Sequence, residues 1–418
     1  MIVVGGGIFG IMIAAEATAR GASALLLEKD DFGGATSLNS LKTIHGGLRH
    51  LQSLDVVQHR RFVGERRWFL KRFPHHVERL PVLMPLYDRG MRRSMVLRAA
   101  LATDSLLSSG RNKDLPEDRQ IPKGYVIGPA EVRQVFPAVA ARGLSGGAVW
   151  YDACMPDSQR LMIEILRWAC GMGLRALNYV SARQLRTTGG KVVGISARDH
   201  VGSADVGFRG ETVVNATGPW CREVGAEFDR DYPELFHRSL AWNVLVDRPA
   251  LSGYALAVAP PRADGQVYFI HPWKGRMLIG TGHSSRNGRD DGIETTDAEL
   301  SAFLDDINEA VPGLDLSLTD VAHVYQGQLP VKKPGTTHLT SDSVVLDHSS
   351  SGGPGGLISV AGNKFTSSRL TAERVMQYLN VGAHGRWDTF DSPGMVGRTS
   401  GTTFDFDWVP AQLDSDVR

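Results

Sequence analysis

The first 28 residues contain the feature that most constrains the fold. An apolar, β-branched segment at 1–4 predicts a buried parallel strand, and a glycine-rich turn at 5–10 follows it. A helix is predicted over 11–20, ended by Gly21, and a second apolar strand at 24–27 leads into Glu28. Strand, helix and strand in this order form a β-α-β unit, from which parallel α/β sheets are built.

The glycine turn has the spacing of a dinucleotide-binding motif, G-x-G-x-x-G at Gly5, Gly7 and Gly10. Gly5 permits the tight turn, Gly7 lets the backbone approach a pyrophosphate, and Gly10 allows close packing of helix on strand. The helix N-terminus offers N–H groups and a positive dipole to the phosphates. Glu28 stands where a carboxylate accepts hydrogen bonds from a ribose diol. We predict a Rossmann-type site, with a plain glycine turn as the disfavoured alternative.

Two later turns favour FAD over NAD as the dinucleotide. An apolar strand at 213–215 runs into Ala216, Thr217 and Gly218, a second turn of the kind that contacts a dinucleotide. A third turn at 362–366 opens a helix predicted over 364–379. The N-terminus of that helix and Lys364 would stabilise negative charge at the pyrimidine edge of a reduced flavin. Lys364 could serve there or, as a catalytic residue, at the substrate, and the alternative is a solvated lysine in a first helical turn.

Composition and charge exclude several classes of protein. The 418 residues carry a formal net charge of +1, which indicates no nucleic-acid partner. The three cysteines match no zinc or disulfide spacing, and no metal site is predicted. No run of about 18 apolar residues is present, and the chain starts directly on its motif, so we expect a cytoplasmic protein. Basic stretches at 59–72 and 89–98 are interpreted as solvated helix faces, with contact to anionic lipid as the alternative.

The segment at 40–50, Ser-Leu-Lys-Thr-Ile-His-Gly-Gly-Leu-Arg-His, carries the most specific resemblance to a known family. It resembles FAD-dependent glycerol-3-phosphate dehydrogenases and oxidases, within the larger group of flavoproteins similar to D-amino-acid oxidase. The resemblance extends over residues 1–380, with further matches at 151–153, 157, 160–161, 215–220, 272–273, 279–281, 362–366 and 369.

The resemblance implies an α/β fold in which a Rossmann-type FAD-binding domain carries an antiparallel-sheet substrate-capping domain. The FAD-binding domain would comprise 1–75, 141–235 and 331–381, and the substrate domain 76–140 and 236–330. The polar segment 382–418 is expected to be a C-terminal tail. The family's chemistry is hydride transfer from a substrate carbon to flavin N5, with a base that removes the hydroxyl proton. Oxygen or a quinone would accept the electrons.

The expected FAD contacts come from the three turns, from the segment at 37–48 and from a few isolated positions. They are Gly5, Gly7, Ile8, Phe9, Gly10, Glu28, Lys29, Ser37, Asn39, Ser40, Lys42, His45, Gly46, Gly47, Leu48, Val180, Ala216, Thr217, Gly218, Trp220, Gly327, Gly362, Lys364, Phe365 and Thr366. His45 is expected to pack beside the flavin without a covalent bond to it.

The chain departs from the family at the substrate end. Gln266 stands where the family has an arginine before the Pro-Trp pair, and Leu329 stands where it has an arginine before a proline. These arginines are expected to clamp a substrate phosphate, and each lost bond to a charged group removes about 1.5–3 kcal/mol. We predict a larger or uncharged polyol, amino alcohol or sugar-like alcohol as substrate, and not glycerol 3-phosphate. Lys332, Lys333, Arg286 or Arg289 could still supply a phosphate site from another direction.

Alcohol oxidation needs a base with a pKa near neutral, and histidine is the natural choice. His50 is preferred because it follows Arg49 in the segment expected to face the flavin. His271 and His283 are further candidates, and a structural role is the alternative for each histidine. The planar guanidinium of Arg49 suits a substrate oxygen, with a surface salt bridge as its alternative. Gln266 and Gln328 are expected to contact the substrate, and Trp242 or Asn243 replaces a histidine of the family's capping sheet, depending on the alignment.

Three functions stay open on these observations. The first is an FAD-dependent dehydrogenase or oxidase that acts on the CH–OH group of an alcohol, in specialised biosynthesis. The second is an FAD-dependent amine or amino-acid oxidase, and the third is glycerol-3-phosphate dehydrogenase. A flavin-binding protein without turnover is disfavoured because Lys42, His45, Arg49 and Lys364 are all present. The oligomeric state is left open.

Overall fold

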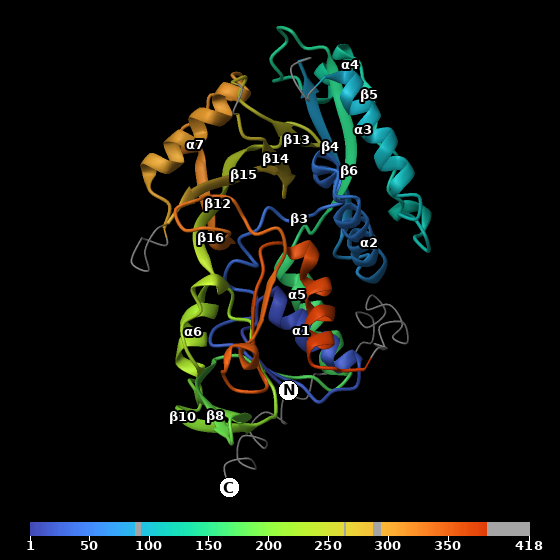
Figure 1. The fold of residues 1–418 in the computed structure, drawn as a ribbon. Helices are drawn as coiled ribbons and strands as arrows, with labels where there is room; N and C mark the ends of the chain where they lie inside the picture. The colour runs from blue at the N-terminus through green and yellow to red at the C-terminus, as the bar shows by residue number, and fades with distance from the viewer. Residues whose placement is uncertain (88–92, 263–264, 287–293, 383–418) are drawn as a thin grey trace, which may run out of the picture.

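The computed structural model describes residues 1–87, 93–262, 265–286 and 294–382. Figure 1 shows two parts, a lower one that contains both described chain ends and an upper one built around a large curved sheet. Residues 383–418 of the expected tail lie outside the described residues, as does Arg289. Within the described ranges, no helix is long and apolar enough to cross a membrane.

The N-terminal β-α-β unit forms as the sequence predicts. β1 (Ile2–Val4) pairs in parallel with β2 (Leu25–Leu27), and α1 (Ile8–Ala19) connects the two strands. The helix begins three residues earlier than predicted, because Gly7 already acts as its N-cap. All residues of α1 except Phe9 are buried, so this helix lies in the interior of the lower part.

The lower part is a six-stranded sheet covered on both faces. Its strand order is β17-β18-β11-β1-β2-β7, and every pair is parallel except β17 with β18. The apolar side chains of one face pack on α1, α5 and α8, and those of the other face pack on α6 and a small sheet of β8, β9 and β10. The bounds are β7 (Arg175–Leu177), β8 (Val180–Thr188), β9 (Lys191–Asp199), β10 (Ala204–Arg209), β11 (Val213–Asn215), β17 (Val344–Asp347), β18 (Leu357–Ala361), α5 (Ser158–Gly171), α6 (Cys221–Phe228) and α8 (Ser368–Tyr378).

The upper part is a nine-stranded sheet, antiparallel apart from the pair β4 and β13. Its order is β16-β12-β15-β14-β13-β4-β6-β3, and β5 pairs with β6. In Figure 1, α7 lies on the outer side of this sheet and α3 lies beside β6. The bounds are β3 (Thr43–Ile44), β4 (Glu78–Leu86), β5 (Tyr125–Ile127), β6 (Gly146–Cys154), β12 (His237–Pro249), β13 (Ala255–Val258), β14 (Tyr268–Trp273), β15 (Arg276–Ser285), β16 (Val321–Val331), α3 (Ser94–Leu107), α4 (Pro129–Val135) and α7 (Asp297–Ala310).

These two sheets give the predicted combination of a Rossmann-type domain and a capping domain, but β6 departs from the expected boundaries. Each residue of Gly146–Cys154 pairs with a residue of β4. The range 141–235, assigned above to FAD binding, therefore also supplies a strand of the upper sheet. The strand is buried along almost its whole length, and an apolar run of this kind fits a central strand of either sheet.

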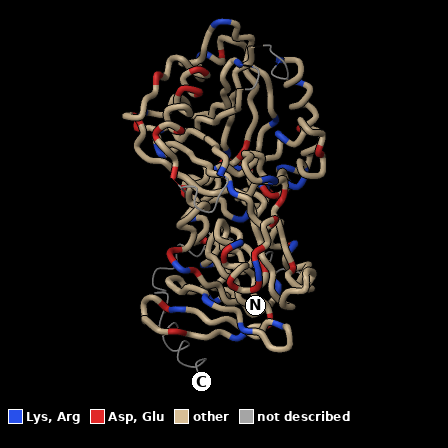
Figure 2. The backbone as a smooth tube through the Cα atoms, turned by 60° about the vertical axis from the view of Figure 1, so that its left-hand side comes forward, with Lys and Arg blue, Asp and Glu red and all other residues tan. Residues whose placement is uncertain are grey.

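Positions of Lys, Arg, Asp and Glu residues are interspersed along the backbone of both parts, as Figure 2 shows. The first basic stretch lies on α2 (Val56–Arg72), where Arg60, Arg61 and Lys71 are exposed and Arg66 is buried. Part of the second stretch lies outside the described residues. The remaining short 3-10 helices are η1 (Leu48–Ser53), η3 (Glu117–Arg119), η4 (Gly218–Trp220), η5 (Pro233–Leu235), η6 (Leu318–Asp320), η7 (His348–Ser351) and η8 (Phe365–Ser367).

Candidate active site

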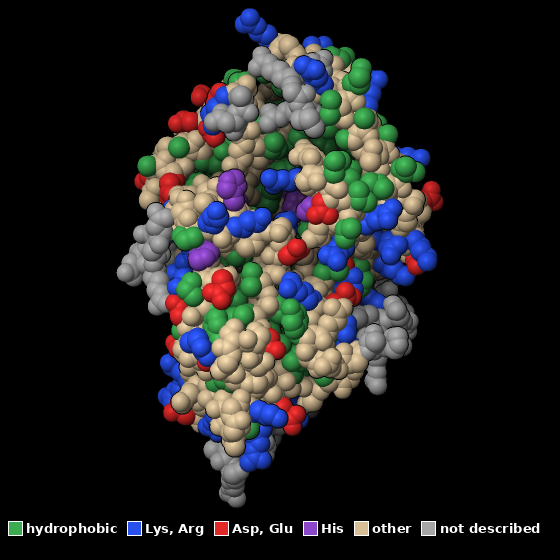
Figure 3. Space-filling model, in the orientation of Figure 1, with side chains coloured by type: hydrophobic (Ala, Val, Ile, Leu, Met, Phe, Trp, Pro, Cys, Tyr) green, Lys and Arg blue, Asp and Glu red, His purple; other side chains and the backbone are tan. Residues whose placement is uncertain are grey.

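A continuous cavity of about 2680 Å³ connects the two parts of the molecule. Its lining runs from the first glycine turn, through the other two turns, to strands β12, β14, β15 and β16 of the upper sheet. Figure 3 shows a hollow in the upper half, with hydrophobic side chains in its depth and Lys, Arg and His side chains at its lower rim. Small-molecule pockets usually measure about 300–1,000 Å³, so this cavity has room for a large cofactor together with a substrate.

The first glycine turn has the geometry that a pyrophosphate needs. Gly5 has a φ of +103°, and a Cβ on it would lie 2.6 Å from the Ala216 carbonyl oxygen. A Cβ on Gly7 would meet a single described atom within 4 Å, the Ser37 Oγ at 3.2 Å, so this side of the turn opens into the cavity. The Ile8 N–H donates to the same Ser37 Oγ at 2.9 Å. The N-terminus of α1 thus faces the cavity, and the Ser37 hydroxyl group lies next to its first N–H groups.

The carboxylate of Glu28 lies beside this turn. It accepts hydrogen bonds from the N–H groups of Gly6 at 2.6 Å and Asp30 at 2.8 Å, and it lines the cavity. Lys29 also lines the cavity and places its ammonium group 4.7 Å from the ring centroid of Trp220. A charged and an aromatic group therefore flank the same end of the cavity.

The second and third turns pack against the first turn and line the cavity with it. Ala216, Thr217, Gly218 and Trp220 all line it. A Cβ on Gly362 would overlap the end of the Phe9 ring. A larger residue at position 362 would therefore displace this ring from its place between the third turn and α1. The Thr366 Oγ1 accepts the His45 N–H at 3.0 Å, which ties the third turn to the segment at 40–50.

A buried carboxylate, Asp152 on β6, holds the segment at 45–46 in place. Its Oδ1 accepts the Gly46 N–H at 2.6 Å, and its Oδ2 lies 3.5 Å from His45 Nδ1. Burial would raise the pKa of Asp152, but His45, the charge of Arg66 and the Gly46 N–H together lower it. Asp152 is thus an ionised anchor beneath the cavity. Asp152 belongs to the stretch 151–153 that matches the family, but no role was predicted for it from the sequence.

Four titratable side chains meet at the upper end of the cavity: Arg49, His50, His283 and Lys364. The imidazole of His50 lies 4.8 Å from the Phe62 ring, and the Lys364 ammonium lies 5.2 Å from the same ring. Burial, then the charges of Lys364 and Arg49, lower the pKa of His50. Burial, then the charge of Arg49, lower the pKa of His283 to about 4. Both imidazoles are therefore neutral at pH 7.

Burial also lowers the pKa of Lys364, with a further contribution from Arg49 and an opposing one from Asp342. The Lys364 side chain therefore stands in an environment where a nearby negative charge would be strongly favoured. We predicted this lysine at the flavin or at the substrate. It lies in the third turn and lines the cavity, and its charge acts on His50.

Neutral side chains line the cavity at the two positions where the family resemblance led us to expect arginines. Gln266 and Leu329 both line the cavity, and Gln266 Nε2 donates to the Thr281 carbonyl oxygen at 2.7 Å. Gln328 is 8% exposed and lines the cavity, and among the described residues its buried Nε2 has no hydrogen-bond partner. The same holds for the buried Nε2 of His283 within the described ranges. Buried polar groups are normally paired, and these two nitrogens are available to a polar group bound in the cavity.

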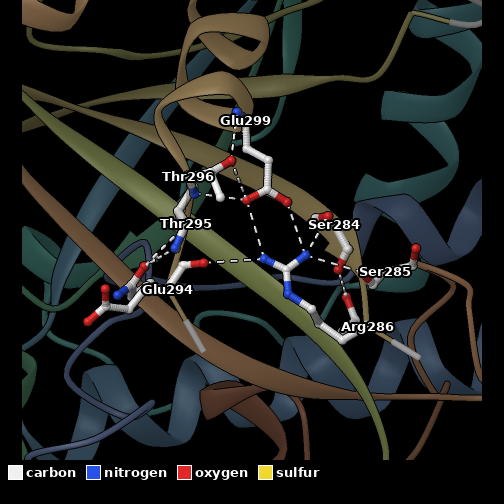
Figure 4. Close-up of polar contacts among 9 residues, drawn as sticks. Ser284, Ser285, Arg286, Glu294, Thr295, Thr296 and Glu299 are labelled. Atoms are coloured by element: carbon white, nitrogen blue, oxygen red, sulfur yellow. Dashed lines mark hydrogen bonds and ion pairs between the residues drawn. The ribbon is translucent and has the colours of Figure 1, made fainter. Parts of the chain in front are cut away.

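Three described cationic side chains were considered above as an alternative phosphate site. Two of them line the cavity and one does not. Lys332 and Lys333 line it. Arg286, in contrast, forms an ion pair with Glu299 at 3.0 Å and also donates to Ser284, Ser285 and Glu294 (Figure 4). Burial opposes ionisation of Glu299, but hydrogen bonds from Arg286 and Ser284 and from the Thr296 N–H hold its pKa at about 2. Arg286 is therefore committed to the start of α7, outside the cavity lining.

Four of the predicted site residues do not line the cavity: Gly10, Lys42, Gly46 and His271. Gly10 packs against the Gly5 carbonyl, where a Cβ would overlap it. Lys42 is 1% exposed and donates to the Leu38 carbonyl and to Ser158 Oγ; burial lowers its pKa to about 8, and Asp157 partly opposes this. His271 is 2% exposed, and burial, with the charge of Lys42, lowers its pKa to about 4.

The other predicted site residues line the cavity, and of the two residues at 242–243 only Asn243 does so. Asn243 lines the cavity, donates to the Asn39 carbonyl at 2.8 Å and accepts from Thr281 Oγ1 at 3.0 Å. Trp242 points to the other face of the sheet, into the apolar core beside Phe303. The position that faces the substrate side is therefore Asn243.

One wall of the cavity was not anticipated from the sequence. It consists of apolar side chains from α3, from strands β4, β6 and β14, and from the residue before β14. These are Met84, Val96, Leu97, Ala100, Leu107, Trp150, Val267 and Phe269. The helical spacing of 96, 100, 103 and 107 predicts an apolar face. A face that packs on the core has the same pattern, so the spacing alone could not identify a cavity wall.

Fold and cavity together define a flavoprotein oxidoreductase, and comparison with known proteins agrees. Residues 1–378 match the model of the DAO family, described as FAD dependent oxidoreductase, and the chain belongs to this family. It is 31% identical over 395 residues to the glycerol-3-phosphate dehydrogenase of Synechocystis sp., covering 90% of this chain and 69% of that protein. It is 32% identical over 389 residues to glycerol-3-phosphate dehydrogenase 1 of Mycobacterium tuberculosis, covering 90% and 72%.

Solved structures extend the comparison. The glycerol-3-phosphate dehydrogenase of Bacillus halodurans, complexed with FAD, superimposes with a TM-score of 0.68 at 25% identity, over 92% of this chain and 65% of that one. The chain thus spans about two thirds of the length of that enzyme. Glycine oxidase from Geobacillus kaustophilus superimposes with a TM-score of 0.62 at 17% identity, over 91% and 94% of the two chains, and shares the fold.

FAD is the cofactor of this protein, and the cavity residues fit it. The open side of Gly7 and the N-terminus of α1 suit the pyrophosphate, and the carboxylate of Glu28 suits a ribose. The turn at 362–366, with Lys364, suits the flavin end.

Proposed function

We propose that this protein oxidises the CH–OH group of an alcohol other than glycerol 3-phosphate. The observation that carries the proposal is the uncharged substrate end, where Gln266 and Leu329 line the cavity at the positions of the family's phosphate-binding arginines. The commitment of Arg286 to Glu299 supports it further. Lys332 and Lys333 at the cavity favour glycerol-3-phosphate dehydrogenase as the second candidate.

The four titratable groups have distinct roles in this proposal. Bound FAD supplies the acceptor for the two electrons that leave the substrate carbon. His50, neutral because burial and Lys364 lower its pKa, accepts the hydroxyl proton. The guanidinium of Arg49 binds the substrate oxygen and stabilises the negative charge that develops there. His283 and Gln328 offer their unpaired buried nitrogens to further polar groups of the substrate.

The proposal is tested by anaerobic reduction of the bound flavin with a panel of alcohols, amines and their phosphates. Alcohols are expected to bleach the flavin absorption and to yield a ketone or aldehyde. Efficient bleaching by glycerol 3-phosphate would instead establish the second candidate. Bleaching by amines with release of ammonia would place the protein with the amine oxidases.

The rate of flavin reduction is expected to rise with pH, with a midpoint below the ordinary histidine pKa of about 6.5, and to stay constant at higher pH, because His50 must be neutral to accept a proton. Lys364→Met removes a positive neighbour, so the pKa of His50 should rise and the acid limb should move to higher pH. Anaerobic stopped-flow reduction measured from about pH 5 to about pH 9 follows both enzymes. An acid limb that stays in place in the variant contradicts the assignment of His50 as the base.

A further inference from the structure

The apolar wall encloses one part of the continuous cavity, called here the chamber, and the roles proposed above for the polar residues leave it unused. Six side chains define this chamber: Met84, Leu97, Ala100, Trp150, Val267 and Phe269. They come from α3 on one side and from strands β4, β6 and β14, with the residue before β14, on the other. No Lys, Arg, Asp or Glu of α3 lines the cavity among the described residues.

The chamber exists because α3 covers the inner face of the upper sheet incompletely. Leu101 is buried and anchors the helix in an apolar cluster with Leu80, Val82 and Trp150. Leu97, Met84, Val267 and Phe269 pack at the margin of that cluster and keep part of their surface uncovered. On the outer face of the same sheet, α7 and α4 pack on the strands in a separate buried cluster. Met84, Leu97, Val267 and Phe269, which keep part of their surface uncovered, all line the cavity.

The chamber adjoins the catalytic groups. Leu48 packs in the same apolar cluster as Leu97 and Met84, and Arg49 and His50 follow it directly in η1. Helix η1 also contacts α3. If the hydroxyl group of a bound molecule lies at Arg49 and His50, a substituent next to that group can therefore extend into the chamber.

We propose that this chamber binds an apolar substituent of the substrate, so that the substrate is an amphipathic alcohol with an alkyl or aryl group beside the oxidised carbon. The proposal rests on the proposed function and deepens it. Polar partners at one end, namely Arg49, His50 and the unpaired nitrogens of His283 and Gln328, fit the hydroxyl-bearing end. Burial of apolar surface from water supplies the affinity at the other end.

A homologous series of methyl ketones, from 2-butanone to 2-octanone, tests the chamber with the oxidised holoenzyme. These ketones keep a polar oxygen and undergo no oxidation at the flavin, so binding is measured separately from turnover, by calorimetry and by the change in flavin absorption. The dissociation constant is expected to fall about fourfold for each added methylene until the chamber is full. An affinity that is independent of chain length overturns the proposal.

Variants of α3 locate the binding. Ala100→Trp fills the chamber and should abolish the dependence on chain length, and Ala100→Leu, a smaller change, should shorten the longest chain that still gains affinity. Met95→Trp on the same helix is the matched control, because Met95 is 82% exposed and lies outside the cavity lining. It should behave as the unchanged enzyme. Flavin content and circular dichroism verify that each variant is folded.

The two proposals can fail independently. If amines rather than alcohols reduce the flavin, the ketone series still reports on the chamber. If Ala100→Trp leaves ketone binding unchanged and instead slows the reoxidation of reduced flavin by a short-chain quinone, the chamber binds the electron acceptor. That result overturns the proposal.

Discussion

Replacement of His50 by asparagine is expected to slow anaerobic flavin reduction by about 10² to 10⁴-fold, the range that general base catalysis contributes. The imidazole lines the cavity beside the Phe62 ring, and burial together with the charge of Lys364 lowers its pKa, which keeps it neutral at pH 7. Asparagine retains hydrogen bonding but accepts no proton at neutral pH. The acid limb of the pH profile should disappear together with the rate, while flavin binding should remain.

The control for this variant is His323→Asn. His323 is exposed on β16, contacts Tyr325 and does not line the cavity. Its replacement should leave the rate of flavin reduction unchanged. If His50→Asn reduces its flavin as fast as the unchanged enzyme, His50 is not the base, and His283→Asn becomes the next variant to measure.

Replacement of Arg369 by leucine is expected to lower the free energy of unfolding by about 3–5 kcal/mol, the cost of removing one partner of a buried ion pair. Arg369 lies in α8 and donates from Nε to Glu65 Oε2 at 3.2 Å and from Nη2 to Glu65 Oε1. The Glu65 side chain is 1% exposed, so the variant would leave its carboxylate buried without its cation. Denaturant unfolding of the holoenzyme at a fixed FAD concentration measures the loss.

The loss of unfolding free energy in Arg369→Leu should increase with pH, because it depends on the ionisation of Glu65. Burial already raises the pKa of Glu65 to about 7, against the opposing charge of Arg369. Without that charge the pKa should rise further, and protonation of Glu65 in the folded state removes the buried charge. The destabilisation should therefore be largest near pH 8 and smaller near pH 5.5.

Two further variants separate the ion pair from the loss of packing. The double variant Glu65→Leu with Arg369→Leu should recover most of the stability, because no buried charge remains. Arg374→Leu on the same helix removes one bond to the Ser343 carbonyl and should cost about 1 kcal/mol. Equal losses in Arg369→Leu and in the double variant would show that the charge of Glu65 is not the cause.

Much of the fold could be predicted because its signals are local. The β-α-β unit and the late turn at 362–366 each combine a glycine turn with an apolar pattern. The assignment of β6 to the upper sheet was not predictable, since its pairing with β4 joins residues that are 60–76 positions apart.

At the site, the chain positions of polar residues were easier to predict than the directions of their side chains. Lys42 belongs to the most specific sequence segment, yet its backbone φ of +61° accompanies a side chain directed at Leu38 and Ser158. His271 and His283 lie on the paired strands β14 and β15, and only His283 lines the cavity. The strand register decides which side a residue faces, and it depends on pairing that the sequence pattern does not reveal.

The strand order of the lower sheet has a consequence for biosynthesis. β1 is made first, but its neighbour β11 leaves the ribosome about 200 residues later, roughly 10–40 s at 5–20 residues per second. During that interval one edge of β1 has no partner, and Gly5 lacks the Ala216 carbonyl against which it packs. β18 follows more than 140 residues after β11. The three turns at the cavity are therefore complete only after residue 366 has been synthesised, and until β11 is present β1 exposes an unpaired strand edge of the kind that promotes aggregation.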